Sequence, residues 1–150
     1  MAEPIRNTYR VDHPAPHGHA VARRVLFGAL LAGPVAWTAQ LTISYGLSSY
    51  ACFPRAHPLA SALPGWGWVW PAALAINIAA LAVAVAAIVV SFRSWQRASE
   101  EAPGGHLQLI ESGEGRTRFL AVWGIWSGVW FAVGILFNTI GVLWVPLCGS

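Results

Sequence analysis

The sequence has no lysine, two cysteines and one methionine, and only 10% of its 150 residues are charged. It also lacks the CxxCH haem-attachment motif, the glycine motifs that bind phosphate, and any recognisable pairing of a nucleophile with a base. Three long apolar runs, at 25–47, 70–92 and 119–145, contain no acidic, basic or histidine residue. Proton relays and ion pathways in membranes are usually built on such residues, so their absence argues against this chemistry within the runs.

The length of these runs predicts an all-α integral membrane protein. A bilayer core of about 30 Å requires roughly 20 helical residues at about 1.5 Å each, and every run meets that length. We expect a three-helix membrane domain at 25–148, with transmembrane helices at 25–47, 70–92 and 119–145. Residues 1–24 are polar and hold too few apolar side chains to form a core, which predicts a flexible tail.

The distribution of arginine predicts the orientation of the chain. Eight of the nine arginines lie before the first run or between the second and third, and only Arg55 lies between the first and second. By the positive-inside rule, the amino terminus should be cytoplasmic and the carboxy terminus periplasmic. The net charge of +3 could indicate a nucleic-acid partner, but the six acidic residues share the same two segments and the arginines form no run. We therefore expect contacts with lipids and no nucleic-acid partner.

Small and amide side chains recur at helical spacing and predict where the helices pack. Small residues let helix backbones approach closely in a membrane, and polar side chains can hydrogen-bond between helices. The polar flank of the first helix could instead bond carbonyl groups of its own helix, so both possibilities stay open. Pro34 removes a backbone donor and should kink this helix unless neighbours compensate. The predicted packing residues are Gln40 and Ser44 in the first helix, Asn77, Ala80 and Ala84 in the second, and Gly124, Gly128 and Ala132 in the third.

The third run carries an aromatic face opposite its small residues. Its small face includes Gly124 and Gly128, which form a GxxxG motif. The opposite face could meet bulk lipid, a bound lipid or quinone tail, or a large partner. This aromatic face consists of Trp123, Trp126, Trp130 and Phe137, which fall within an arc of about 60°.

The two cysteines predict a disulfide. Cys52 follows the first run and Cys148 follows the third, so three spans bring both to the non-cytoplasmic side, which is oxidising in bacteria. A copper site that adds His57 is the alternative, although CxxC spacing and methionine ligands are both lacking. The tail also carries a histidine tract that could bind metal, but we expect it to be solvated. The tract is made of His13, His17 and His19.

Four short phrases carry a resemblance to known proteins. They are Leu-Ala-Gly-Pro-Val-Ala-Trp at 31–37, Tyr-Ala-Cys at 50–52, Arg-Phe-Leu-Ala at 118–121 and Pro-Leu-Cys at 146–148. Together they resemble a family of small three-helix proteins that accompany haem–copper cytochrome oxidases in proteobacteria.

The resemblance implies an accessory, non-catalytic subunit of a respiratory terminal oxidase in the bacterial inner membrane. Haem and copper would belong to larger membrane redox subunits, and this chain alone would bind no cofactor. The small-residue and polar faces would dock on that complex, so replacing Gly128 by leucine should release the subunit. Two alternatives remain open: a free-standing oxidase assembly factor, and a small oligomeric transporter or channel.

Overall fold

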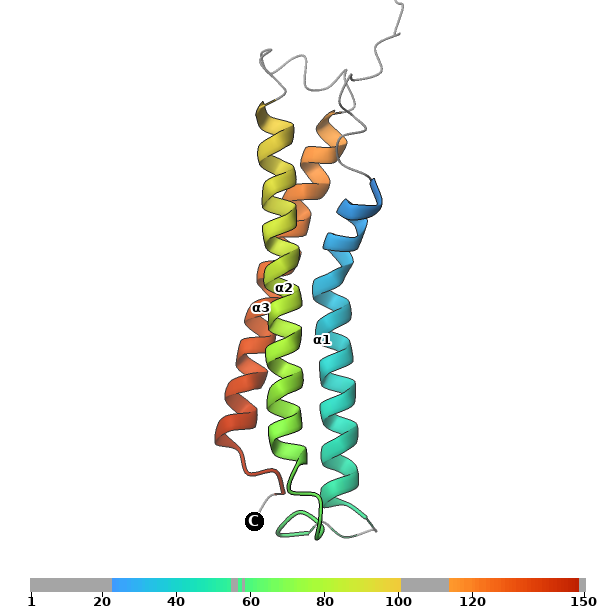
Figure 1. The fold of residues 1–150 in the computed structure, drawn as a ribbon, viewed down its shortest axis with the longest axis vertical. Coiled ribbons are helices and arrows are strands. Elements are labelled where there is room, and N and C mark those ends of the chain that lie inside the picture. Colours follow the sequence, from blue (N-terminus) through green and yellow to red (C-terminus); the bar gives the residue numbers. More distant parts are fainter. Residues whose placement is uncertain (1–22, 55–56, 58, 101–113, 149–150) are drawn as a thin grey trace, which may run out of the picture.

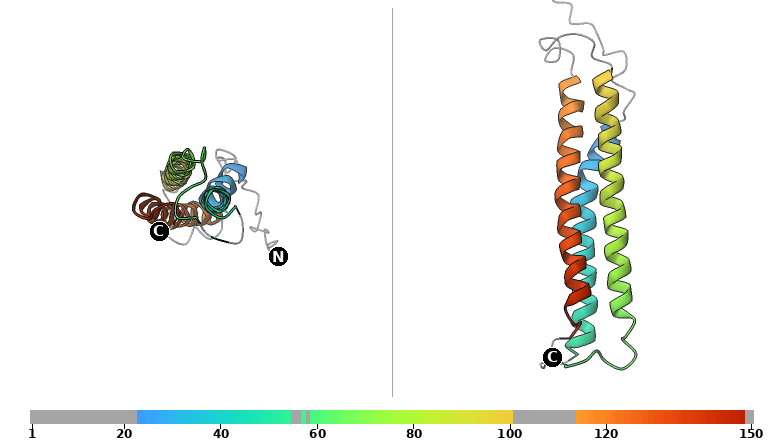
Figure 2. Two further views of the ribbon diagram at one scale, coloured as in Figure 1. Left: turned by 90° about the horizontal axis from the view of Figure 1, so that it is seen from below. Right: turned by 90° about the vertical axis from the view of Figure 1, so that its left-hand side faces the viewer.

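The computed structural model describes residues 23–54, 57, 59–100 and 114–148. This part of the chain consists of three long helices and contains no strand, with α1 at Arg23–Cys52, α2 at Val69–Glu100 and α3 at Glu114–Trp144. α1 and α3 run in the same direction and α2 runs opposite to both (Figure 1). Seen from one end, the helices lie at the corners of a triangle (Figure 2).

All three helices are long and apolar enough to cross a membrane, which confirms, for the described residues, the predicted all-α class and three helices of spanning length. They are longer than the apolar runs suggested, at 30, 32 and 31 residues. At about 1.5 Å per residue each helix is longer than the roughly 30 Å of a bilayer core. The predicted tail at 1–24 lies outside the described residues, apart from its last two, which begin α1.

A proline follows the end of α1 and the end of α3 at the same spacing. α1 continues past the predicted end at residue 47 through serines and a tyrosine, and stops at Cys52. Pro54 follows two residues later, and Pro146 stands in the same position after Trp144, the end of α3. The α conformation is disfavoured for the residue directly before a proline. Each helix therefore ends just before that residue, two positions before the proline.

The core is built from small side chains. α2 turns one narrow stripe toward the other helices, with buried residues separated by three and four positions, as in helices packed at a shallow crossing angle. Most of these side chains are a methyl or a hydroxymethyl group, so the helix backbones lie close together. The stripe consists of Ala73, Asn77, Ala80, Ala84, Ala87, Ser91 and Ser94.

Pro34 lies inside α1, and the helix continues through it. Because proline has no N–H, the carbonyl of Leu30, four residues earlier, loses its helical donor. The hydroxyl of Ser127 in α3 donates to this carbonyl at 3.2 Å. At the same level a Cβ added to Gly33 would lie 3.4 Å from Phe131 Cβ, so the two helices are close enough for this bond. A neighbouring helix therefore supplies the donor that Pro34 removes.

The end of the bundle that carries the cysteines is closed by a disulfide and a turn. Cys52 and Cys148 are joined, with their Cα atoms 5.4 Å apart. The loop that follows α1 turns at Gly65, whose φ of +86° suits glycine after Pro64. The Trp66 N–H donates to Leu63 O across this turn. The disulfide therefore links the ends of α1 and α3 beside the start of α2.

Candidate functional site

The interior contains two apolar clusters at different heights. The first, the disulfide cluster, surrounds the linked cysteines, and the second, the alanine cluster, lies nearer the middle of the helices. The disulfide cluster consists of Ala51, Cys52, Val69 and Cys148, and the alanine cluster consists of Ala80, Ala84, Ala132 and Ile135.

Between these clusters each helix contributes polar side chains, which we call the polar layer. In every helix the polar positions fall between a residue that packs in one cluster and a residue that packs in the other. The bounding pairs are Trp37 and Ala51 in α1, Val69 and Ala80 in α2, and Ile135 in α3 with Cys148 just beyond its end. Because both clusters join all three helices, the polar positions between them share one level. The polar layer consists of Gln40, Ser44, Asn77, Asn138 and Thr139.

Asn77 is the centre of the hydrogen bonds in this layer. Its side chain is fully buried, and its Nδ2 donates to the Ala73 carbonyl of its own helix at 2.8 Å. Its Oδ1 accepts from Asn138 Nδ2 of α3 at 3.1 Å, and it also lies 3.3 Å from Thr139 Oγ1, whose single proton is shared with the Ile135 carbonyl at 2.8 Å. Polar groups buried away from water require such partners. The amide therefore joins α2 to α3 at this level.

The two side chains that α1 contributes to the polar layer have no such hydrogen-bond partners. Gln40 is 1% exposed and Ser44 is 9% exposed, yet neither the amide nitrogen and oxygen nor the hydroxyl has a hydrogen-bond partner. The open possibility that these groups bond carbonyls of their own helix is therefore wrong. Thr38 and Thr42 form such bonds instead, each at 2.8 Å to the carbonyl four residues earlier.

The small residues of α3 pack against α2 within the same chain. A Cβ added to Gly128 would lie 2.5 Å from Ile88 Cγ1, and one added to Gly124 would collide with the Ser91 hydroxyl. Ala132 lies in the alanine cluster beside Ala80 and Ala84. These faces are covered by the chain's own helices, which corrects the expectation that they dock on a larger complex.

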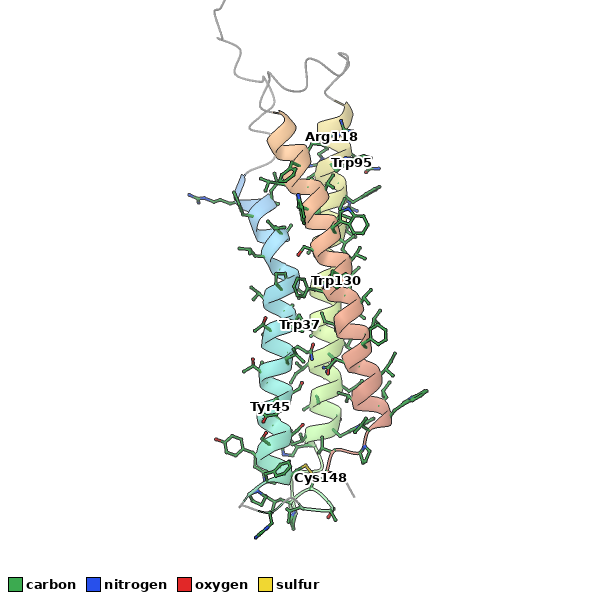
Figure 3. The ribbon with its side chains drawn as sticks, turned by 180° about the vertical axis from the view of Figure 1, so that it is seen from behind. Trp37, Tyr45, Trp95, Arg118, Trp130 and Cys148 are labelled. Atoms are coloured by element: carbon green, nitrogen blue, oxygen red, sulfur yellow. A yellow bond between two sulfur atoms is a disulfide. The ribbon has the colours of Figure 1, made fainter. Side chains whose placement is uncertain are left out.

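The aromatic face of α3 is exposed on the outside of the bundle. Trp126 is 67% exposed, Trp130 is 77% exposed and Phe137 is 70% exposed. On α1, Tyr45 is also 77% exposed and points away from the bundle (Figure 3). The aromatic residues of α3 differ from this isolated tyrosine because they follow one another along a single face.

No group of three potential metal ligands occurs among the described residues. The alternative copper site lacks thiolate ligands, because both sulfur atoms are joined in the disulfide. His57, its third expected ligand, is exposed. The histidine tract at 13–19 lies outside the described residues.

Three side chains that join the helices were missed in the sequence. They are Ser127, Thr139 and Trp70, whose indole N–H donates to Val142 O at 3.0 Å. Pro34 follows Leu30 by four residues and so deprives that carbonyl of its helical donor, whereas Val142 lies in the last turn of α3, where carbonyls have no helical donor. The position of Leu30 four residues before Pro34, and of Val142 near the end of α3, could have indicated that these two carbonyls need a partner.

No family model, curated protein or solved structure matches this chain. The fold and the polar layer thus define a three-helix bundle whose helices are long and apolar enough to cross a membrane, with a buried neutral polar centre.

Proposed function

We propose that the protein is an accessory, non-catalytic subunit of a larger membrane redox complex, a respiratory terminal oxidase of the haem–copper type. The observation that carries the proposal is the aromatic face of α3, which remains exposed while the small faces are used inside the bundle. Tryptophan and phenylalanine supply large contact areas at interfaces between proteins. The docking surface is therefore the aromatic face rather than the GxxxG face.

The membrane and the orientation belong to the same proposal. The protein lies in the bacterial inner membrane with its amino terminus in the cytoplasm, supported by the eight-to-one division of arginines. This orientation puts the disulfide in the oxidising periplasm. The redox centres, haem and copper, belong to the partner subunits.

The interior of the bundle favours this role over a transporter or channel. The polar layer contains amide and hydroxyl groups but no ionisable one, and apolar clusters lie on both sides of it. Coupled carriers usually rely on a carboxylate within the membrane.

Purification in mild detergent tests the proposal. A tagged chain should retain a haem-containing partner, seen by its visible spectrum and identified by mass spectrometry. Replacing both Trp126 and Trp130 by alanine should remove that partner, because the variant loses most of the exposed aromatic area. Tyr45→Ala is the matched control, since Tyr45 and Trp130 are equally exposed at 77%. It should keep the partner.

Two results would contradict the proposal. One is a chain that purifies without any haem protein; the other is full retention of the partner by the double tryptophan variant, which would assign the aromatic face to lipid. An assembly factor would separate from the mature complex, so retention in a fixed ratio to haem distinguishes a subunit from that alternative.

A further inference from the structure

Gln40 is the most conspicuous polar side chain in the interior. Its amide offers two donors and two acceptor lone pairs, and neither its nitrogen nor its oxygen bonds any group of the protein. Each buried amide or hydroxyl left without a partner destabilises the folded state, more so in a membrane where bulk water is distant. An apolar side chain at this position would avoid that cost, so the amide requires a partner from outside the chain.

The surroundings of Gln40 restrict what that partner is. Ser44, one helical turn further along α1, is also buried and unpartnered. Asn138 lies at the same level on α3 and donates to Asn77, while its own carbonyl oxygen accepts no hydrogen bond from a described residue. These groups are neutral and include both donors and acceptors. A charged ligand would find no counter-charge here, whereas a small neutral molecule that both donates and accepts would satisfy them.

We infer that the polar layer is a binding site for water, with Gln40 and Ser44 of α1 bridged by bound molecules to the Asn77, Asn138 and Thr139 cluster of α2 and α3. Water forms two to four hydrogen bonds in such sites, which matches the unpaired donors and acceptors. Ala73 and Ala80, the buried neighbours of Asn77 on α2, have only methyl side chains, so α2 offers no other polar side chain at this level.

The apolar clusters on either side define the character of this site. The disulfide cluster separates it from one end of the bundle and the alanine cluster from the other. The water layer is therefore bounded at both ends by apolar side chains and joins α1 to the α2–α3 pair, and it does not form a path across the membrane. This inference is independent of the proposed oxidase partner.

Solid-state NMR of the intact chain in lipid bilayers tests the inference directly. Glutamine side chains are labelled with ¹⁵N, and magnetisation is transferred from water to their amide protons. Gln40 should receive it although it is 1% exposed, and Gln96, exposed on α2, is the positive control. Absence of transfer to Gln40, while Gln96 shows it, would overturn the inference.

Replacing Gln40 by methionine gives a second test, because the thermal midpoint should change in opposite directions for a hydrated and a dry polar layer. If water bridges the layer, Gln40→Met removes its anchor, leaves the Ser44 hydroxyl and the Asn138 carbonyl oxygen without their water partners and lowers the thermal midpoint. If the layer is dry, the same change removes an unsatisfied amide and raises the midpoint, which would overturn the inference. Gln96→Met, at an exposed position, should leave the midpoint unchanged.

Discussion

At the scale of single residues, two backbone carbonyls lack a helical donor, one because of Pro34 and one because α3 ends, and a side chain from another helix donates to each. Ser127 donates to Leu30 O, four residues before Pro34, and Trp70 donates to Val142 O in the last turn of α3. Both bonds connect different helices, so each carbonyl without a helical donor forms a hydrogen bond that holds two helices together. Such compensation is the usual condition for proline within membrane helices.

A double-mutant cycle on Ser127 and Pro34 tests this pairing. Ser127→Ala should destabilise the bundle by about 0.6 kcal/mol, and by no more than about 1.7 kcal/mol, the range for hydrogen bonds between membrane helices. In a Pro34→Ala background the cost should vanish, because the N–H of the new alanine satisfies Leu30 O. Thermal or denaturant unfolding of all four proteins measures the coupling. Additive effects would mean that the serine does not serve the carbonyl freed by the proline.

At the scale of helices, the small faces decide how closely α2 and α3 approach. Gly128 faces Ile88 and the Ala84 carbonyl, so the space for a side chain at this position is taken by the neighbouring helix. Gly28 in α1 has no atom within 4 Å of an added Cβ. A side chain would therefore be tolerated at Gly28 but not at Gly128, and only Gly128 lies at a contact between helices.

Gly128→Leu should lower the stability of the isolated chain by about 1–3 kcal/mol, because the leucine displaces Ile88 and separates α2 from α3. Gly28→Leu, the matched control, should be neutral or slightly stabilising, since leucine is the better helix former and meets open space. Thermal unfolding monitored by circular dichroism, without any partner present, compares the two. Equal midpoints for both variants would show that α2 and α3 are not in close contact at Gly128.

At the scale of the whole molecule, the interior is divided into levels: the disulfide cluster, the polar layer and the alanine cluster. The disulfide joins residues 96 positions apart and closes a loop that includes all of α2 and α3. In a free chain, closing a loop of this size is worth about 4.7 kcal/mol by the chain-entropy estimate. Helices already inserted in a membrane have less freedom to lose, so the stabilisation here is smaller than that figure.

In freshly isolated membranes, the two cysteines should resist alkylation until a reductant is added, and the intact mass should then increase by two alkyl groups. Replacing both by alanine should lower the thermal midpoint and leave the helix content unchanged, because the helices satisfy their own backbone bonds. Circular dichroism and intact mass spectrometry measure these effects. Complete alkylation without reductant would show that the cysteines are not joined, and would remove the support that the disulfide gives to a periplasmic location.

The sequence by itself determined those features that depend on local pattern. Three runs free of charge predicted three helices of membrane-spanning length, and the separation of Gly128 from Trp130 around α3 predicted which face is buried. The position of Cys52 and Cys148 after odd-numbered helices predicted that they meet. Helical periodicity and hydropathy act over a few neighbouring residues, so these features can be seen without the neighbouring helices.

Only the tertiary structure decided which groups meet across the bundle. The sequence could not show that the small face of α3 packs on Ile88 rather than on a partner, or that Asn77 finds Asn138 while Gln40 finds no protein group. These outcomes depend on the relative rotation and vertical shift of three helices. That register is set by the packing of all three together, through contacts such as Gly128 with Ile88, 40 positions apart, and Ser127 with Leu30, 97 positions apart.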